Sequence, residues 1–246
     1  MTQRPPDFTE RDYSLSATAH DLERVDQMLD ELASRAHGTE VGSILDLGCG
    51  MGALTLRAGR RLGVTELIGV DADEERLEIC RERGLKAFTI DLNRDRFPLD
   101  DASVGLVQSF GVMAYLVLYD NVISETARVL KDGGHFLFSM PNLGSYVNRA
   151  SLLLGYQPRE VEVSSRPLVG MLPLYKRREG LPPPYLHAAT LRCMRELLDG
   201  AGMDIVRARP LSPDWGNRPL RMIDAVLGRR ASLARRFIVL ARRRPR

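Results

Sequence analysis

The sequence predicts an α/β fold in which a mostly parallel sheet carries helices on both faces. Short apolar runs alternate with segments of helical periodicity along most of the chain, which is the pattern of successive βαβ units. The clearest unit begins at Ser43 with a short apolar run that ends in an acid, Asp46, and leads through three glycines into a helical pattern at Leu54, Ala58 and Leu62. The length of 246 residues suits one sizeable domain of this class.

A helix is expected before the first strand. Between Ser16 and His37 the apolar residues recur at helical spacing, and Gly38 follows where a C-terminal cap belongs. We expect this N-terminal helical cap, residues 1–38, to cover one edge of the sheet. Tyr13, just before it, is a candidate to close over a bound ligand.

The turn after the first strand predicts a ligand site. Gly48, Gly50 and Gly52 allow positive φ angles and a close approach of a ligand to the backbone, and the following helix presents free N–H groups. Gly48-x-Gly50-x-x-Ala53 also fits a permissive dinucleotide fingerprint, so an NAD(P)-binding oxidoreductase is one alternative. Asp46, however, is poorly placed beside a pyrophosphate and well placed beside a ligand that carries an ammonium group.

The run from Asp46 to Gly52, Asp-x-Gly-x-Gly-x-Gly, resembles the first motif of the class I S-adenosylmethionine (SAM)-dependent methyltransferases. The resemblance implies a Rossmann-like, seven-stranded mixed sheet, mostly parallel, whose last strand is antiparallel. It implies a single methyltransferase domain over residues 1–246, with SAM as cofactor and S-adenosylhomocysteine (SAH) as product. A non-catalytic SAM-binding protein is the second alternative.

A set of residues at the ends of the first four strands is expected to hold the cofactor. They are Asp46, Gly48, Cys49, Gly50, Gly52, Asp71, Ala72, Asp91, Leu92, Ser109 and Phe110. Residues 65–70 predict the second strand, and an acid at its end can accept hydrogen bonds from both ribose hydroxyls of an adenosine. Residues 85–90 predict the third strand. The resemblance implies that Asp91 then receives the adenine amino group and that the Leu92 N–H meets a ring nitrogen.

The fourth strand, residues 104–110, places Ser109 and Phe110 at its carboxyl end, where ligands bind in open parallel sheets. Phe110 either flanks the adenine or packs in the core. Many relatives carry Glu-His just after this strand, whereas this chain has Ala114-Tyr115. Tyr115 is therefore a candidate to hydrogen-bond the acceptor or the methionine moiety.

The next part of the chain is expected to supply acceptor recognition. A helix over residues 121–130 and a turn at residues 131–134 lead into the fifth strand, residues 135–140. Residues 142–189 then form a substrate-recognition insertion, because a long irregular segment inside a compact domain is usually a lid or a binding loop. It begins with a short helix, and residues 160–163 are a possible strand.

His187 ends this insertion and precedes a predicted helix, residues 190–201, that Thr190 caps. A neutral hydroxyl acceptor needs a base, and histidine titrates near neutral pH, so His187 is a candidate base. The alternative for His187 is a packed loop histidine. The resemblance extends to relatives that modify glycans or lipid-linked sugars, which implies a small-molecule or glycan/lipid-linked acceptor.

The C-terminal part predicts two more strands with a helix between them. Residues 203–208 form the sixth strand and residues 237–241 the last one. Residues 219–227 read as a basic amphipathic helix. The residues expected to form its buried stripe are Leu220, Ile223 and Leu227.

Charge is concentrated in this basic C-terminal segment. Residues 218–246 contain ten arginines and one acid, a formal charge of +9, so the remainder carries −6 of the chain's total of +3. A basic amphipathic segment can contact an anionic membrane or a polyanionic carrier. The alternative is an ordinary solvated face, and no nucleic-acid partner is expected.

The remaining composition favours a cytoplasmic protein without metal or disulfides. Cys49, Cys80 and Cys193 lie far apart in sequence without the spacing of a metal site, which argues for a reducing compartment. The N-terminus lacks the apolar region of a signal peptide. No stretch approaches the roughly 20 apolar residues that a membrane span requires.

Overall fold

The computed structural model describes residues 19–35, 41–161, 163–164, 169–173, 185–211 and 218–245. Within them, the predicted strands form one sheet in the order β3-β2-β1-β4-β5-β7-β6. The first five pair in parallel, and β7 is antiparallel to both of its neighbours, as expected for the last strand. The strands are β1 (Ser43–Leu47), β2 (Glu66–Asp71), β3 (Lys86–Thr89), β4 (Val104–Phe110), β5 (Leu130–Pro141), β6 (Met203–Leu211) and β7 (Arg236–Arg243).

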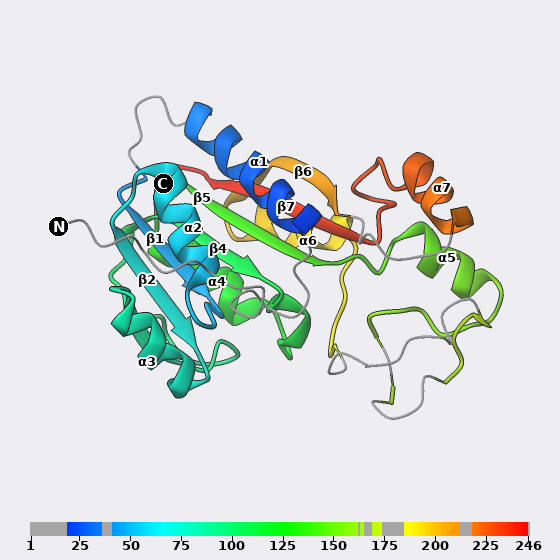
Figure 1. The fold of residues 1–246 in the computed structure, drawn as a ribbon, viewed down its shortest axis with the longest axis horizontal. Helices are drawn as coiled ribbons and strands as arrows, with labels where there is room; N and C mark the ends of the chain where they lie inside the picture. Colours follow the sequence, from blue (N-terminus) through cyan, green and yellow to red (C-terminus); the bar gives the residue numbers. More distant parts are fainter. Residues whose placement is uncertain are drawn as a thin grey trace.

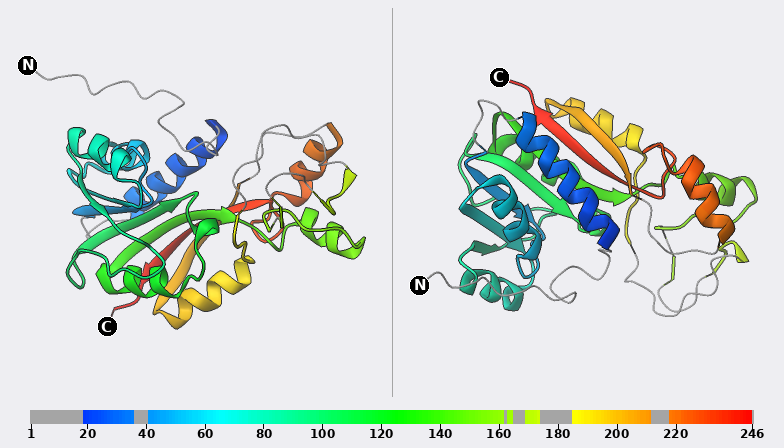
Figure 2. Two further views of the ribbon diagram at one scale, coloured as in Figure 1. Left: turned by 90° about the horizontal axis from the view of Figure 1, so that it is seen from below. Right: turned by 45° about the horizontal axis from the view of Figure 1, so that its top comes forward.

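Helices cover both faces of this sheet, as Figure 2 shows from two directions. One buried cluster joins α1, α2 and α3 to one face, and another joins α4 and α6 to the other. The expectation that α1 covers a sheet edge is wrong, because its buried residues pack with those of β1, β4, β5 and β7 on one face. These helices are α1 (Ala19–Arg35), α2 (Ala53–Leu62), α3 (Glu74–Glu82), α4 (Asp120–Val129) and α6 (Leu191–Gly200).

Strand β1 is buried on both faces, which is typical of a central parallel strand. Its side chains alternate between the two clusters, because successive residues of a strand point to opposite faces. Ile44 belongs to the cluster with α2, whereas Leu45 and Leu47 belong to the cluster with α4. Asp46 therefore points toward α2, directly below the glycine turn.

Strand β5 is longer than expected. The predicted helix–turn–strand boundary at residues 131–134 is wrong, because these residues continue β5 from Leu130 as an irregularity in its pairing with β4. Val104 pairs with Leu130 and Leu106 pairs with His135, so an advance of two residues along β4 corresponds to five residues along β5. Gly133 has φ +76° there, and a Cβ on Gly134 would lie 2.9 Å from the Lys131 carbonyl oxygen. The glycine pair therefore permits a bulge, where a turn was predicted.

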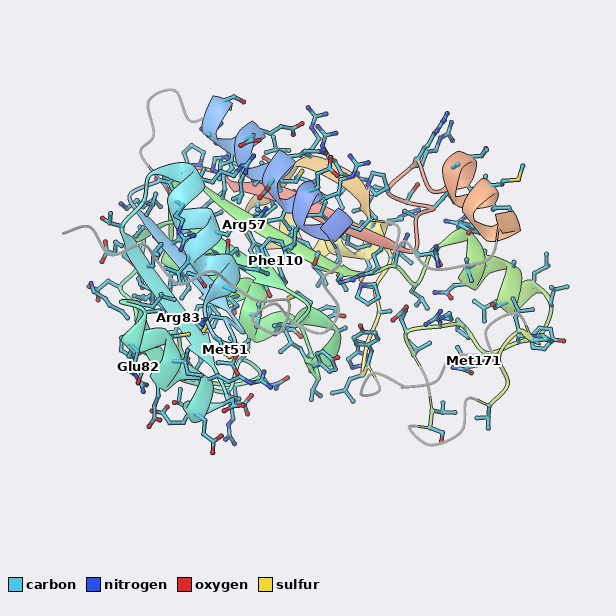
Figure 3. All side chains as sticks on the ribbon, viewed as in Figure 1. Met51, Arg57, Glu82, Arg83, Phe110 and Met171 are labelled. Carbon is cyan, nitrogen blue, oxygen red and sulfur yellow. The ribbon has the colours of Figure 1, made fainter. Side chains whose placement is uncertain are left out.

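The insertion begins with α5 (Tyr146–Leu153), as expected. The possible strand at residues 160–163 is wrong for the described part, because residues 160 and 161 form a turn and a bend and Glu160 has φ +70°, outside the extended backbone of a regular strand. Met171 is buried, 2% exposed, and is the labelled residue farthest from the glycine turn in Figure 3. Residues 165–168 and 174–184 of the insertion lie outside the described part of the chain, as do Tyr13 and His37.

The C-terminal helix is α7 (Arg218–Leu227), and its predicted buried stripe is wrong where the structure describes it. Ile223 is 41% exposed and Leu227 is 38% exposed, while the Leu220 side chain lies outside the description. Figure 1 shows why: α7 lies beyond the end of the sheet, beside α5, rather than on either face. Strand β7, in contrast, is fully buried over residues 237–241 and is a core strand as expected.

Candidate cofactor and acceptor site

The glycine turn joins β1 to α2 at the carboxyl edge of the sheet. Gly48, Gly50 and Gly52 all have positive φ, between +53° and +80°. A Cβ on Gly48 would lie 2.1 Å from Val112 Cγ2, whereas one on Gly50 would meet nothing within 4 Å. Val112 therefore fills the space beside Gly48, whereas the space beside Gly50 is open. A ligand can approach the backbone at Gly50.

Asp71, at the end of β2, is fixed against this turn. Its Oδ2 accepts a hydrogen bond from the Gly50 N–H at 2.8 Å, and its Oδ1 accepts one from the Asp73 N–H at 3.1 Å. The side chain is only partly buried. A carboxylate held by two backbone donors keeps further lone pairs for a ligand hydroxyl. The sequence thus correctly brought Asp71 and the glycine turn to one place.

Asp46 is enclosed below the turn and is 2% exposed. Its Oδ2 accepts hydrogen bonds from Thr55 Oγ1 at 2.6 Å and from Gln108 Nε2 at 2.7 Å. Burial raises the pKa of Asp46 from 3.8 to about 7, although both hydrogen bonds oppose the rise; nearby Asp71 adds to it. The expected attraction for an ammonium group therefore has to act from beneath the turn, not through an exposed carboxylate.

Two cysteines that are far apart in sequence meet under the same turn. Cys49 Sγ lies 3.8 Å from Cys80 Sγ, and Cys80 Sγ donates to the Gly50 carbonyl oxygen at 3.1 Å. Both are buried free thiols. Arg83 Nη1 donates to the Met51 carbonyl oxygen at 2.7 Å, and Figure 3 shows these two labelled residues beside each other. Helix α3 therefore supports the turn through Cys80 and through Arg83, which directly follows the helix.

The residues expected to contact the adenine lie one loop away. The Asp91 Oδ1 accepts hydrogen bonds from the backbone and side-chain amides of Asn93, and the side-chain bond is the main reason that the pKa of Asp91 is lowered. Asp91 is partly exposed, whereas Leu92 is 8% exposed. Since β3 ends at Thr89, both residues lie in the loop beyond the strand, not at its last position.

The other expected cofactor residues differ in accessibility. Ala72 is exposed beside Asp71. Ser109 is fully buried, with its Oγ 3.4 Å from the Leu47 carbonyl oxygen, and links β4 to β1. Phe110 is 9% exposed and belongs to the core cluster with α2, so of its two interpretations the packing one has direct support. Figure 3 labels Phe110 in the centre of the molecule.

An aromatic cluster lies on the acceptor side, around η2 (Met113–Tyr115). The rings of Tyr115 and Tyr185 lie 5.1 Å apart, and burial raises the pKa of Tyr115. The backbone N–H of His187 donates to the Ala114 carbonyl oxygen at 3.1 Å, and its ring meets Tyr119 edge-on at 6.3 Å. His187 itself is exposed. Tyr115 and His187, the two proposed catalytic residues, therefore belong to two short segments that contact each other, η2 and residues 185–187.

Sequence reasoning missed three residues of this site. Thr55 and Gln108 hold Asp46, and the Tyr185 ring packs at a tilt against that of Tyr115. Gln108 carried a signal, since it is a polar residue inside the apolar fourth strand, and buried polar groups are normally paired. Tyr185 carried none, because its partner lies 70 positions earlier and only tertiary packing joins them.

We predict that the segment carrying His187 depends on the cap of α6. Thr190 accepts a hydrogen bond from the Cys193 N–H at 3.1 Å at the start of this helix. Thr190→Ala should cost about 1 kcal/mol, seen as a fall of about 2–4 °C in the thermal unfolding midpoint. Thr190→Ser keeps the hydroxyl and should restore most of the loss; equal midpoints for the two variants would contradict the capping role.

Comparison with known proteins identifies the first half of the chain. A family model for a methyltransferase domain matches residues 44–134, from β1 to the bulge of β5. A probable S-adenosylmethionine-dependent methyltransferase of Mycolicibacterium smegmatis is 36% identical over 122 residues, 48% of this chain. The chain spans 44% of that protein and less than half of the first two curated relatives it matches.

Two further similarities extend over most of the chain. A trans-aconitate 2-methyltransferase of Mycolicibacterium gilvum is 28% identical over 237 residues, covering 86% of this chain and 91% of that protein. The crystal structure of a SAM-dependent methyltransferase from Mesorhizobium loti superposes with a TM-score of 0.55 at 20% identity. That alignment covers 87% of this chain and 100% of the other, so the fold is shared throughout.

Proposed function

Because the chain belongs to the class I SAM-dependent methyltransferases, we propose that it transfers the methyl group of SAM to an acceptor bound between η2 and the segment 185–190. The observation that carries this proposal is the bond between the Gly50 N–H and Asp71, at the open position of the glycine turn. It fixes a carboxylate at the end of β2 beside the glycine turn, which supports our assignment of the ribose to this position.

The residues around the turn fit SAM. The open backbone at Gly50 admits the ligand, Asp71 is the candidate partner of the ribose hydroxyls, and Asp91 and Leu92 are candidates for the adenine. Asp46 supplies a negative charge beneath the turn for the ammonium group of the amino-acid tail. SAM, when bound, supplies an electrophilic methyl group together with its own leaving group, so the chain's task is chiefly alignment.

On the acceptor side we assign alignment to Tyr115 and proton removal to His187. Tyr115 is 37% exposed and packs on Tyr185, so its hydroxyl stands on a fixed ring at the mouth of the site. His187 is exposed and is held through its backbone to Ala114, which leaves its imidazole available to a hydroxyl acceptor. An amine acceptor would need only to be unprotonated.

The acceptor belongs to one of two classes in this proposal. The curated relative that aligns over most of the chain is named as a methyltransferase of trans-aconitate, a small carboxylic acid, which supports a small-molecule acceptor. The resemblance of the His187 segment to enzymes of glycans and lipid-linked sugars supports the other class. A panel of both classes, assayed for transfer of a labelled methyl group from SAM, separates them.

The proposal is tested first at the cofactor. We predict that titration calorimetry detects SAM and SAH binding and detects no NADH binding, because the Asp46 carboxyl lies beneath the turn that a pyrophosphate would occupy. Binding of NADH alone would establish the oxidoreductase alternative. Binding of SAM without transfer to any member of the acceptor panel would favour the non-catalytic alternative.

A further inference from the structure

The part of the molecule beyond the sheet carries an unusual number of exposed apolar side chains. Three consecutive leucines end α5: Leu152 is 58% exposed, Leu153 is 87% exposed and Leu154 is 62% exposed. On α7, Met222 is 73% exposed and Val226 is 68% exposed, beside the half-exposed Ile223 and Leu227. Single exposed apolar residues are ordinary, whereas a gathering of this kind marks an interaction surface.

The two helices are fixed to each other through the segments next to them. The Tyr146 N–H, at the start of α5, donates to the Leu233 carbonyl oxygen at 2.9 Å. The Asn142 side chain donates to the carbonyl oxygens of Ala231 and Ala234, between α7 and β7. Figures 1 and 2 show α5 and α7 together beyond the same end of the sheet, away from α3. We name this region, residues 146–154 and 218–230, the distal surface.

The distal surface is basic on balance. By sequence it contains five arginines and one acid, Asp224, a formal charge of +4. Arg149 on α5 and Arg229 and Arg230 after α7 are exposed. A second copy of this chain would bring the same positive charge against itself, whereas an anionic surface complements it. Exposed apolar side chains together with arginines are the composition of a helix that lies in a membrane interface.

We propose that the distal surface docks on an anionic phospholipid bilayer, with the leucines of α5 and the apolar face of α7 inserted between head groups. Arg229 and Arg230 then lie at head-group level. No described helix is long and apolar enough to cross a bilayer, so the contact is one of the interface. Because α5 begins five residues after β5 ends at Pro141, docking also brings the acceptor edge of the sheet close to the bilayer.

Three arginines farther along the tail belong to the fold and not to this surface. Arg235 and Arg243 are buried, 5% and 7% exposed. Arg244 Nη1 pairs with Asp199 Oδ1 at 2.9 Å. The formal charge of +9 in residues 218–246 therefore overstates the charge available for docking, and only the arginines next to α7 are candidates for substitution.

Sedimentation of the full chain with vesicles tests the proposal. We expect binding to vesicles of phosphatidylcholine mixed with phosphatidylglycerol, weakening as salt is raised, and little binding to phosphatidylcholine alone. Arg229→Gln with Arg230→Gln should lower the partition coefficient roughly thirtyfold, since each basic residue near an anionic surface raises binding by about fivefold. Arg192→Gln with Arg195→Gln, on the exposed side of α6, is the matched control and should change nothing.

The apolar half of the surface is tested separately on each helix. Leu152→Gln with Leu153→Gln, and Met222→Gln with Val226→Gln, should each lower the partition coefficient about tenfold per residue. Unchanged SAH affinity shows that each variant is folded, which keeps this test independent of the proposed transfer reaction. Equal recovery of the wild type with both vesicle types would overturn the proposal. So would concentration-dependent dimers that the same substitutions abolish, since the occupant would then be a second copy.

Discussion

Replacing Asp46 with asparagine is expected to stabilise the fold by about 4 kcal/mol at pH 8. Burial raises the pKa of Asp46 from 3.8 to about 7, so the folded chain holds this proton more tightly than the unfolded chain. The stability it contributes is fully present below pH 4, is lost as the pH rises from about 4 to about 7, and stays lost above that. Asparagine carries no charge and removes this dependence.

The surroundings can accept the amide with its oxygen in the place of Oδ2. Thr55 Oγ1 and Gln108 Nε2 can then both donate to the new Oδ1, as they do to the carboxylate. The buried charge at position 46 is therefore a cost to stability, of the kind retained at binding sites.

Urea unfolding at pH 5 and pH 8 measures this effect. The unfolding free energy of the wild type should fall between the two pH values by more than that of Asp46→Asn. The same variant should bind SAH about tenfold more weakly, because the ammonium group loses the charge beneath the turn. Asp100→Asn, at an exposed acid, should change stability by no more than about 0.5 kcal/mol. Equal unfolding free energies for Asp46→Asn and wild type at pH 8 would contradict the argument.

Replacing Asp71 with alanine is expected to weaken SAH binding by about 1.5–3 kcal/mol, or roughly 10- to 150-fold. The change removes the acceptor that holds the Gly50 N–H at 2.8 Å and the proposed partner of the ribose. Hydrogen bonds to an ionised group contribute more than neutral ones, and the turn is left without its fixed carboxylate. Calorimetry with SAH measures the loss directly.

The neighbouring acid is the matched control. Asp73 Oδ1 accepts from the Arg76 N–H at 3.3 Å and caps α3, so Asp73→Ala should cost about 1 kcal/mol of stability. It should leave SAH affinity unchanged, because its side chain faces the helix and not the turn. SAH binding of Asp71→Ala at wild-type affinity would show that the ribose lies elsewhere.

The sequence by itself determined the class of fold and most of the cofactor half. Periodicity predicted the seven strands, and the fourth of them, Val104–Phe110, has the expected bounds. The glycine turn and Asp71 were predictable because both sit at ends of neighbouring parallel strands, which lie at one edge by topology alone. The cofactor follows from the same motif, and the family model includes it, since the match begins at residue 44.

Only the tertiary structure decided how these side chains are held and which surfaces remain open. The sequence predicted Asp46 as an acid beside the ligand, whereas in the fold Thr55 and Gln108 enclose it, since strand alternation turns it under α2. Cys49 and Cys80 lie far apart in the sequence, but the packing of α3 beneath the glycine turn brings their sulfur atoms to within 3.8 Å of each other. Periodicity predicts that α7 has an apolar face, but it does not predict whether another element covers that face. Burial depends on where the helix lies relative to the sheet, and in this fold Met222 and Val226 remain exposed.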